Sequence, residues 1–211
     1  MMQNYHKNTE KTERDNAIAR LEKLHPHKTL LYLAIFGSTL VFLFMIVSYT
    51  ISHRDPSAFI NFEFPKAFVV SLVLLLFSSY TMTRVLPAFA KDDLKTVRNS
   101  LGVTLLLGVA FTISQYIGWS ELYHSGIYLS GKASGAYLYV ISGLHVLHLA
   151  AGLVFLTVIY TQMSAVSRDP VKMLIMVTNP YQRIKLEMLT AYWHFVDALW
   201  LILFFYFLFS F

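Results

Sequence analysis

The chain has 211 residues, of which 56% are hydrophobic and 16% aromatic, and its formal net charge is +5. Soluble proteins have about 45–50% apolar residues, so this composition favours an integral membrane protein over a soluble one. The chain has no Cys, which excludes disulfides, thiolate metal sites and thiol nucleophiles. Its basic residues are spread over separate segments, which argues against nucleic-acid binding.

The first 28 residues form a polar tail. They lack the apolar central region of a cleavable signal peptide, so none is expected. We interpret the tail as a solvated arm with a short helix near residues 13–24, which His25-Pro26-His27 would end before the membrane. The predicted organisation is therefore a tail over 1–28 and a transmembrane domain over 29–211.

Five mainly apolar segments follow the tail. A helix rises about 1.5 Å per residue, so about 20 residues cross a hydrocarbon layer of about 30 Å. Helices are expected because lipid cannot satisfy a bare backbone, and the segments lack the alternation of a membrane barrel. The second segment is short and should extend by about a turn at either end. The sequence thus predicts an all-α bundle of five transmembrane helices over 29–51, 67–83, 99–119, 137–161 and 189–211.

Basic residues alternate between the connecting segments in a way that predicts orientation. The tail and the loops after the second and fourth spans hold 14 Lys and Arg, whereas the remaining loops hold 3, namely Arg54, Lys66 and Lys132. The positive-inside rule then places the N-terminus in the cytoplasm and, with five spans, the C-terminus outside.

Polar groups inside the spans are costly, so they are the places to look for function. In the third span Gln115 and Trp119 are four residues apart and share a helical face. We expect Gln115 to form a hydrogen bond with another helix and Trp119 to lie at the outer membrane interface.

The fourth span contains "SGLHVLHLAAG", which places His145 and His148 on one face, with Gly143 and Gly152 leaving room for a close neighbour. Two imidazoles at this spacing suit a metal or haem site. They also suit hydrogen bonds to a neighbouring helix or a lipid headgroup. We favour the second interpretation, because two His rarely complete a metal site and the predicted spans contain one other His, His194.

The fifth span places His194 and Asp197 one turn apart, and Glu187 lies two turns before His194 on a similar face. A carboxylate near the bilayer centre costs roughly 2.5–3.5 kcal/mol on insertion scales. We therefore predict a polar seam of these residues with His145 and His148. The seam is either a proton relay or an interhelical clamp, and we favour the clamp, whose hydrogen bonds contribute about 0.6–2 kcal/mol each.

These residues carry a resemblance to a known family. "YWHFVDALW" at 192–200 and "SGLHVLHLAAG" at 142–152 resemble the hallmarks of subunit III of haem-copper terminal oxidases. "FEFPKAFVVSLVLLLFSSYT" at 62–81 and "GVAFTISQYIGW" at 108–119 resemble two weaker motifs of that family. Glu187 lies seven residues before His194, which is also the spacing in that family. The resemblance covers all five spans in order.

The resemblance implies a five-helix form that lacks the first two helices of longer members. It implies an accessory subunit of a proton-pumping oxygen reductase (a cytochrome c oxidase) in aerobic respiration, located in the bacterial inner membrane. Such a subunit packs against subunits I and II, holds phospholipids, supports proton uptake, and takes part in respiratory supercomplexes. Catalysis, haem and copper would belong to the partner subunits, with no catalytic, cofactor-binding or metal residue on this chain. The residues implied to make lipid or interhelical contacts are Glu63, Gln115, His145, His148, Glu187, Trp193, His194 and Asp197.

The first span departs from the family pattern. Many relatives carry a carboxylate in the middle of the corresponding helix, whereas this chain reads "FGSTL" at 36–40. A membrane-embedded proton acceptor at that place is therefore not expected. The two missing helices would also remove one wall of the lipid-holding cleft of longer members.

Other functions remain open on the sequence alone. An accessory subunit of a quinol oxidase or of a nitric oxide reductase shares the same hallmarks. An independent transporter built on the polar seam is a further alternative, although no pair of broken helices in matching halves supports it. Copurification with haem-bearing subunits would favour the accessory role, and transport by the purified chain alone would favour the last.

Overall fold

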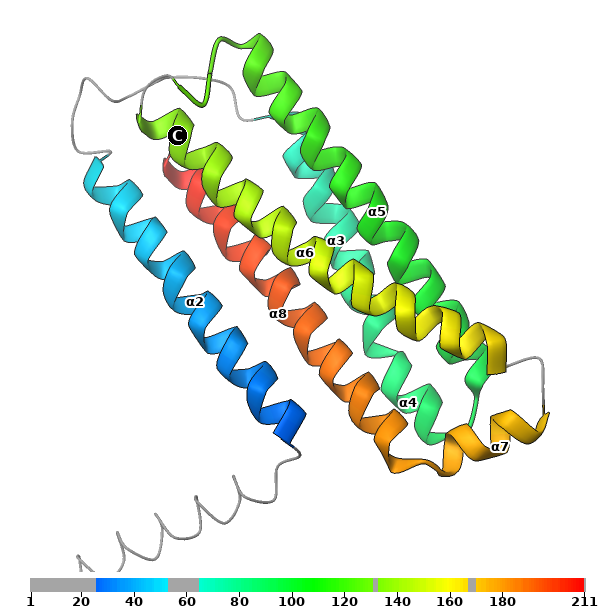
Figure 1. Ribbon diagram of the computed structural model, residues 1–211. Coiled ribbons are helices and arrows are strands. Elements are labelled where there is room, and N and C mark those ends of the chain that lie inside the picture. The colour runs from blue at the N-terminus through cyan, green and yellow to red at the C-terminus, as the bar shows by residue number, and fades with distance from the viewer. Residues whose placement is uncertain (1–25, 53–64, 131–132, 167–169, 211) are drawn as a thin grey trace, which may run out of the picture. The chain divides into compact units, whose positions relative to one another are not determined.

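The computed structural model describes residues 26–52, 65–130, 133–166 and 170–210, and every regular element in them is a helix. Five of these helices are long and apolar enough to cross a membrane, which confirms the predicted all-α fold with five transmembrane helices. The N-terminal tail before residue 26 and the predicted contact residue Glu63 lie outside the described residues. The helices are α2 (Pro26–Ser52), α3 (Lys66–Thr83), α4 (Val85–Ala90), α5 (Leu94–His124), α6 (Ala133–Val166), α7 (Pro170–Thr178) and α8 (Pro180–Ser210) (Figure 1).

The long helices extend beyond the predicted apolar segments. The last one begins at Pro180 instead of residue 189, and α4 continues the second span to Ala90. Hydropathy marks the part of a helix that suits hydrocarbon, whereas backbone hydrogen bonds continue into the polar flanks. Local signals set the true start of α8: Pro occupies the first helical position, and the Asn179 side chain accepts a hydrogen bond of 3.0 Å from the backbone N–H of Tyr181.

The chain divides into two units, residues 1–39 and 40–211. The described part of the first unit is the beginning of α2, whose side chains are mostly exposed and apolar, such as Leu33 and Phe36. In the second unit α3 packs on α5, α5 on α6, and both α3 and α6 on α8 (Figure 1). The C-terminal half of α2 is linked to this bundle by two hydrogen-bonded hydroxyl pairs, Ser48 with Tyr137 at 2.7 Å and Thr50 with Tyr206 at 2.6 Å.

The bundle is apolar on its surface and partly polar inside. Leu106, Tyr116 and Phe209 are 71%, 72% and 84% exposed, whereas Gln115 and His145 are fully buried. Large exposed apolar areas are rare on soluble monomers, because water penalises them. Lipid removes that penalty, so this distribution supports a bundle that lies in a membrane.

A side-chain cap begins α5. Asp93 accepts hydrogen bonds from the Thr96 backbone N–H at 3.0 Å and from the Thr96 hydroxyl at 2.6 Å. The Thr96 side chain and backbone favour the carboxylate form, so the pKa of Asp93 is lowered from its ordinary value. The contribution of the cap is therefore complete above the ordinary aspartate pKa and is lost as the pH falls through the lowered one.

Replacing Asp93 with alanine should loosen the first turn of α5, because the N–H of Thr96 loses its acceptor. Hydrogen exchange of the amides at residues 94–97 should become faster, while exchange in the middle of α5 stays unchanged. Asp92→Asn is the matched control, because it removes a neighbouring charge and leaves the cap in place. Equal exchange in the Asp93→Ala variant and the wild-type protein would show that the cap does not hold this turn.

Candidate functional site

Two consecutive serines of α3 bind two consecutive residues of α8. The indole Nε1 of Trp193 donates a hydrogen bond of 2.7 Å to the Ser78 Oγ. A second hydrogen bond, 3.0 Å long, connects the Ser79 Oγ with the His194 Nδ1. Neighbouring residues of a helix point in different directions, so these two bonds fix both the rotation and the height of α8 against α3. The two bonds link α3 to α8, and we call the group formed by Ser78, Ser79, Trp193 and His194 the clamp.

Trp193 reaches Ser78 through a gap that two glycines leave open. A Cβ atom added at Gly108 of α5 would lie 3.0 Å from the Trp193 ring and 2.8 Å from Leu153. A Cβ atom added at Gly152 of α6 would lie 3.6 Å from the same ring. The indole is therefore surrounded by α3, α5 and α6, and only 1% of it is exposed. Small residues permit such close packing of helices in membranes.

Asp197 lies one turn after Trp193 and His194 and is 5% exposed. Its carboxyl group interacts with the Ser79 hydroxyl, which also binds His194. Its Oδ2 atom is buried and has no hydrogen-bond partner. His194 and Asp197 thus share one serine of α3, as expected for two residues that project toward the same neighbour.

The two histidines of α6 have different surroundings although they are one turn apart. The His145 ring is fully buried and stacks on Trp200, with ring centroids 5.0 Å apart, and it meets Phe111 edge-on at 5.7 Å. The His148 Nδ1 donates to the Leu144 carbonyl at 2.9 Å, and its ring contacts Phe42. A local backbone bond orients the His148 ring. The His145 ring is held by aromatic packing, and neither of its ring nitrogens has a hydrogen-bond partner among the described residues. In the described parts of the chain no three His, Cys, Asp or Glu side chains are grouped so that they could hold a metal ion.

Hydrogen bonds from α5 reach both neighbouring helices. The Gln115 side-chain amide donates to the Ser71 Oγ of α3 at 2.9 Å, which confirms the predicted bond to another helix. The Trp119 Nε1 donates to the Ser142 Oγ of α6 at 2.9 Å, and the indole is half-buried. Ser142 belongs to the fourth-span motif that holds His145, so the hydroxyl at the start of this motif binds α5.

Glu187 lies apart from the clamp. Its Oε1 accepts a hydrogen bond of 3.0 Å from the Arg183 Nε, one turn earlier on α8. Arg183 is more than half exposed, so this is a surface ion pair near the beginning of the helix. The structure therefore divides the predicted seam: His194 and Asp197 meet at α3, His145 and His148 are held by other contacts, and Glu187 pairs with a cation.

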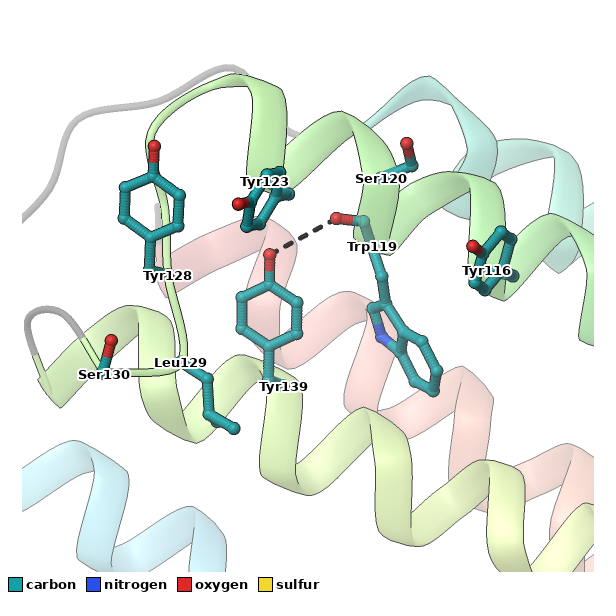
Figure 2. A pocket seen from close by; sticks show the side chains of 8 residues that line it. All are labelled: Tyr116, Trp119, Ser120, Tyr123, Tyr128, Leu129, Ser130 and Tyr139. Carbon is teal, nitrogen blue, oxygen red and sulfur yellow. Dashed lines mark hydrogen bonds between the residues drawn. The ribbon is translucent and has the colours of Figure 1, made fainter.

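An open pocket lies where α5 ends and α6 begins (Figure 2). Its volume is about 810 Å³, and five aromatic residues dominate its lining: Tyr116, Trp119, Tyr123, Tyr128 and Tyr139. The Tyr139 hydroxyl shares its one hydrogen between the Ile127 carbonyl at 2.9 Å and the Trp119 carbonyl at 3.3 Å, and Figure 2 shows the second of these bonds. Tyr139 of α6 is thereby linked both to α5 and to the loop that follows α5. Tyr and Trp rings of this kind are typical of the membrane–water interface.

Comparison with known proteins gives the family of this chain. Residues 29–210 match the sequence model of the family described as cytochrome c oxidase subunit III. The chain belongs to the cytochrome c oxidase subunit III family.

Relatives within the subunit III family include proteins of several bacteria. The cytochrome c oxidase subunit 3 of Bacillus sp. (strain PS3) is 27% identical over 177 residues, which cover 82% of this chain and 80% of that protein. A probable cytochrome c oxidase subunit 3 of Nocardia farcinica is 30% identical over 139 residues, covering 66% of this chain and 64% of that protein. A probable cytochrome c oxidase subunit 3 of Rickettsia felis is 32% identical over 155 residues, covering 74% of this chain. The match spans about half the length of the Rickettsia protein, 49%.

Three serines of this chain are the hydrogen-bond partners of motif residues, and the sequence pattern did not predict that pairing. Ser71, Ser78 and Ser142 each accept a hydrogen bond from a large side chain of another helix. A sequence signal for two of them exists, because Ser71 and Ser78 are seven residues apart and so share a face of α3. Serine is common in membrane helices for packing alone, and this spacing does not name its partners.

Proposed function

We propose that this protein is the accessory subunit III of a proton-pumping haem-copper oxygen reductase, a cytochrome c oxidase, in the bacterial cytoplasmic membrane. The observation that carries the proposal is the family match, which extends over nearly the whole helical domain. In this role the chain stabilises the catalytic subunit. Haem, copper and oxygen reduction belong to subunits I and II.

The contacts of the described residues support a structural role. The polar residues of the two motifs bind neighbouring helices of the same bundle, through Ser78, Ser79 and Ser142. The exposed faces of α3 and α5 are apolar and suit lipid or the membrane helices of a partner. With the N-terminus in the cytoplasm, as the distribution of Lys and Arg indicates, the turn between α4 and α5 and the start of α8 face the cytoplasm.

The stabilising role is tested by comparing oxidase complexes purified with and without this chain. Both complexes should reduce oxygen at a similar initial rate, because the redox centres lie in other subunits. The complex without the chain should lose activity sooner during continuous turnover. Equal durability of the two complexes would contradict a stabilising role, and a complete loss of initial activity would place part of the catalytic machinery on this chain.

Proton uptake is the second part of the proposal, and it concerns Asp197, Ser79 and His194. We propose that these residues act as a clamp and that they do not carry the protons that are pumped. Asp197→Asn keeps the shape and one hydrogen-bonding oxygen, so assembly and proton pumping by the complex should stay close to wild-type values.

Measuring proton pumping by reconstituted complexes tests the expected result for Asp197→Asn. Thr190→Val serves as a control on the same helix. Thr190 is buried and is not among the residues of the clamp. Loss of proton uptake in Asp197→Asn with unchanged assembly would contradict the clamp and support a relay.

Phospholipid binding is the third part, and we propose the aromatic pocket of Figure 2 as the place. Its volume of about 810 Å³ lies in the range of ligand sites, and its rings and hydroxyl groups suit a lipid headgroup with the first carbons of its chains. Tyr123 and Tyr128 pack edge-to-face, with ring centroids 5.0 Å apart, and they are 61% and 45% exposed.

Replacing both Tyr123 and Tyr128 with alanine should reduce the number of phospholipids that remain bound after purification, because the rings provide the apolar wall of the pocket. Native mass spectrometry of the purified complex would count them. Tyr32→Ala is the control, since Tyr32 is half exposed and does not line the pocket. An unchanged lipid count in the double variant would place lipid binding elsewhere.

A further inference from the structure

A small cavity lies inside the bundle beside Asp197, where α3, α5, α6 and α8 meet. Its volume is about 10 Å³. Much of its lining is apolar and includes Leu75, Leu107, Phe111 and Leu149, whereas its polar side chains include those of Ser78 and Asp197. A cavity of roughly 10–15 Å³ holds one water molecule when polar partners are present.

The carboxyl group of Asp197 leaves one hydrogen-bonding atom unused in this cavity. Asp197 is 5% exposed, and its Oδ2 is buried without a partner. Buried polar atoms in folded proteins nearly always have a protein or water partner. Ser79 interacts with the carboxyl group but leaves Oδ2 unpaired.

Ser78 supplies the second polar group. Its hydroxyl oxygen accepts from the Trp193 indole at 2.7 Å, and the residue is 3% exposed. A hydroxyl group also has one hydrogen to donate. Among the described residues no hydrogen bond in which Ser78 is the donor is found, so this hydrogen is available to a molecule in the cavity.

We propose that one buried water molecule occupies this cavity, accepting a hydrogen bond from the Ser78 hydroxyl and donating one to the Asp197 Oδ2. The water adds a second link between α3 and α8, from Ser78 to Asp197, one helical turn along α8 from the direct bond of Trp193 to Ser78. The volume excludes a hydrated ion or a lipid chain. The proposal depends on the geometry within this chain and holds whether or not the chain works in an oxidase.

The test is an experimental map of the full-length chain, in its purified complex, at a resolution that shows ordered water. The wild-type protein should show one isolated density peak within hydrogen-bonding distance of both the Ser78 Oγ and the Asp197 Oδ2. An empty cavity, or an Oδ2 atom that bonds directly to a protein or lipid group, would overturn the proposal.

Substitutions test separately whether Ser78 and Asp197 each bind the water. Asp197→Leu should remove the peak, because an apolar side chain offers no acceptor, and Ser78→Ala should weaken or remove it for lack of the donor. Asp197→Asn, which keeps an oxygen, and the control Thr190→Val, which changes a buried residue of α8 away from the cavity, should both retain it. If Asp197→Leu does not fold, the Ser78→Ala and Asp197→Asn maps still decide: a full peak in Ser78→Ala, or none in Asp197→Asn, would contradict the assignment.

Discussion

Replacing Trp193 with alanine is expected to lower the free energy of unfolding by about 3–5 kcal/mol, the range for a fully buried large aromatic residue. The indole is 1% exposed and fills the space between Gly108 and Gly152. Its removal leaves a cavity between three helices, and Ser78 loses the donor that binds it at 2.7 Å. The variant should therefore be far more destabilising than truncation of an exposed residue of α8.

Thermal unfolding of the purified protein in detergent, together with its steady-state amount in membranes, would measure this effect. Phe209→Ala is the matched control, because Phe209 lies on the same helix and is 84% exposed. The control should stay within about 0.5 kcal/mol of the wild-type protein. A Trp193→Ala variant as stable as the Phe209→Ala variant would show that the indole does not anchor α8.

Gly118→Ala should destabilise the bundle by about 1–3 kcal/mol, the usual range for overpacking a core. A Cβ atom at this position of α5 would fall against the ring of Phe68, closer than real Cβ atoms approach other atoms. Phe68 is fully buried and meets Trp200 edge-on with centroids 5.7 Å apart, so its ring cannot move aside without disturbing a second aromatic contact. The clash therefore separates α3 from α5.

Gly37→Ala makes the same chemical change where a Cβ atom would have nothing within 4 Å. Because alanine favours helix by up to about 1 kcal/mol over glycine, this control should be neutral or slightly stabilising. Chemical unfolding of both variants in detergent gives the comparison. Equal stability of the two variants would mean that Phe68 yields without cost, and the close approach of α3 and α5 would then have no energetic importance.

The sequence predicted the five helices because a long apolar segment has few alternatives in a membrane. It predicted the Gln115 bond for a similar reason, since a buried amide needs a partner. It did not predict where α8 begins, because Pro180 and Asn179 set that position by local backbone geometry, outside the apolar segment.

The candidate site was predicted in part. Helical spacing brought His194 and Asp197 to the same neighbour, Ser79. The same spacing also suggested Glu187 for the seam, but Arg183 lies one turn from it and offers a full positive charge. Spacing along one helix says which residues share a face, and the partner on the other helix decides what they bind.

The packing around Trp193 shows why the other contacts of the candidate site could not be predicted from the sequence. Gly108 and Gly152 lie on different helices, and their importance depends on the height at which the indole enters the bundle. In the same way, the stacking of His145 on Trp200 joins residues of α6 and α8 whose positions follow from the tertiary arrangement.

The central claim is that the chain assembles with an oxidase and contributes no redox centre of its own. Purification of the tagged chain from native membranes under mild conditions, with identification of its partners and a haem spectrum, tests this most directly. We predict that haem-bearing oxidase subunits copurify with it, and that the chain alone, once separated, shows no haem absorption and no bound copper. Haem or copper retained by the isolated chain, or a chain that purifies without any oxidase subunit, would contradict the claim.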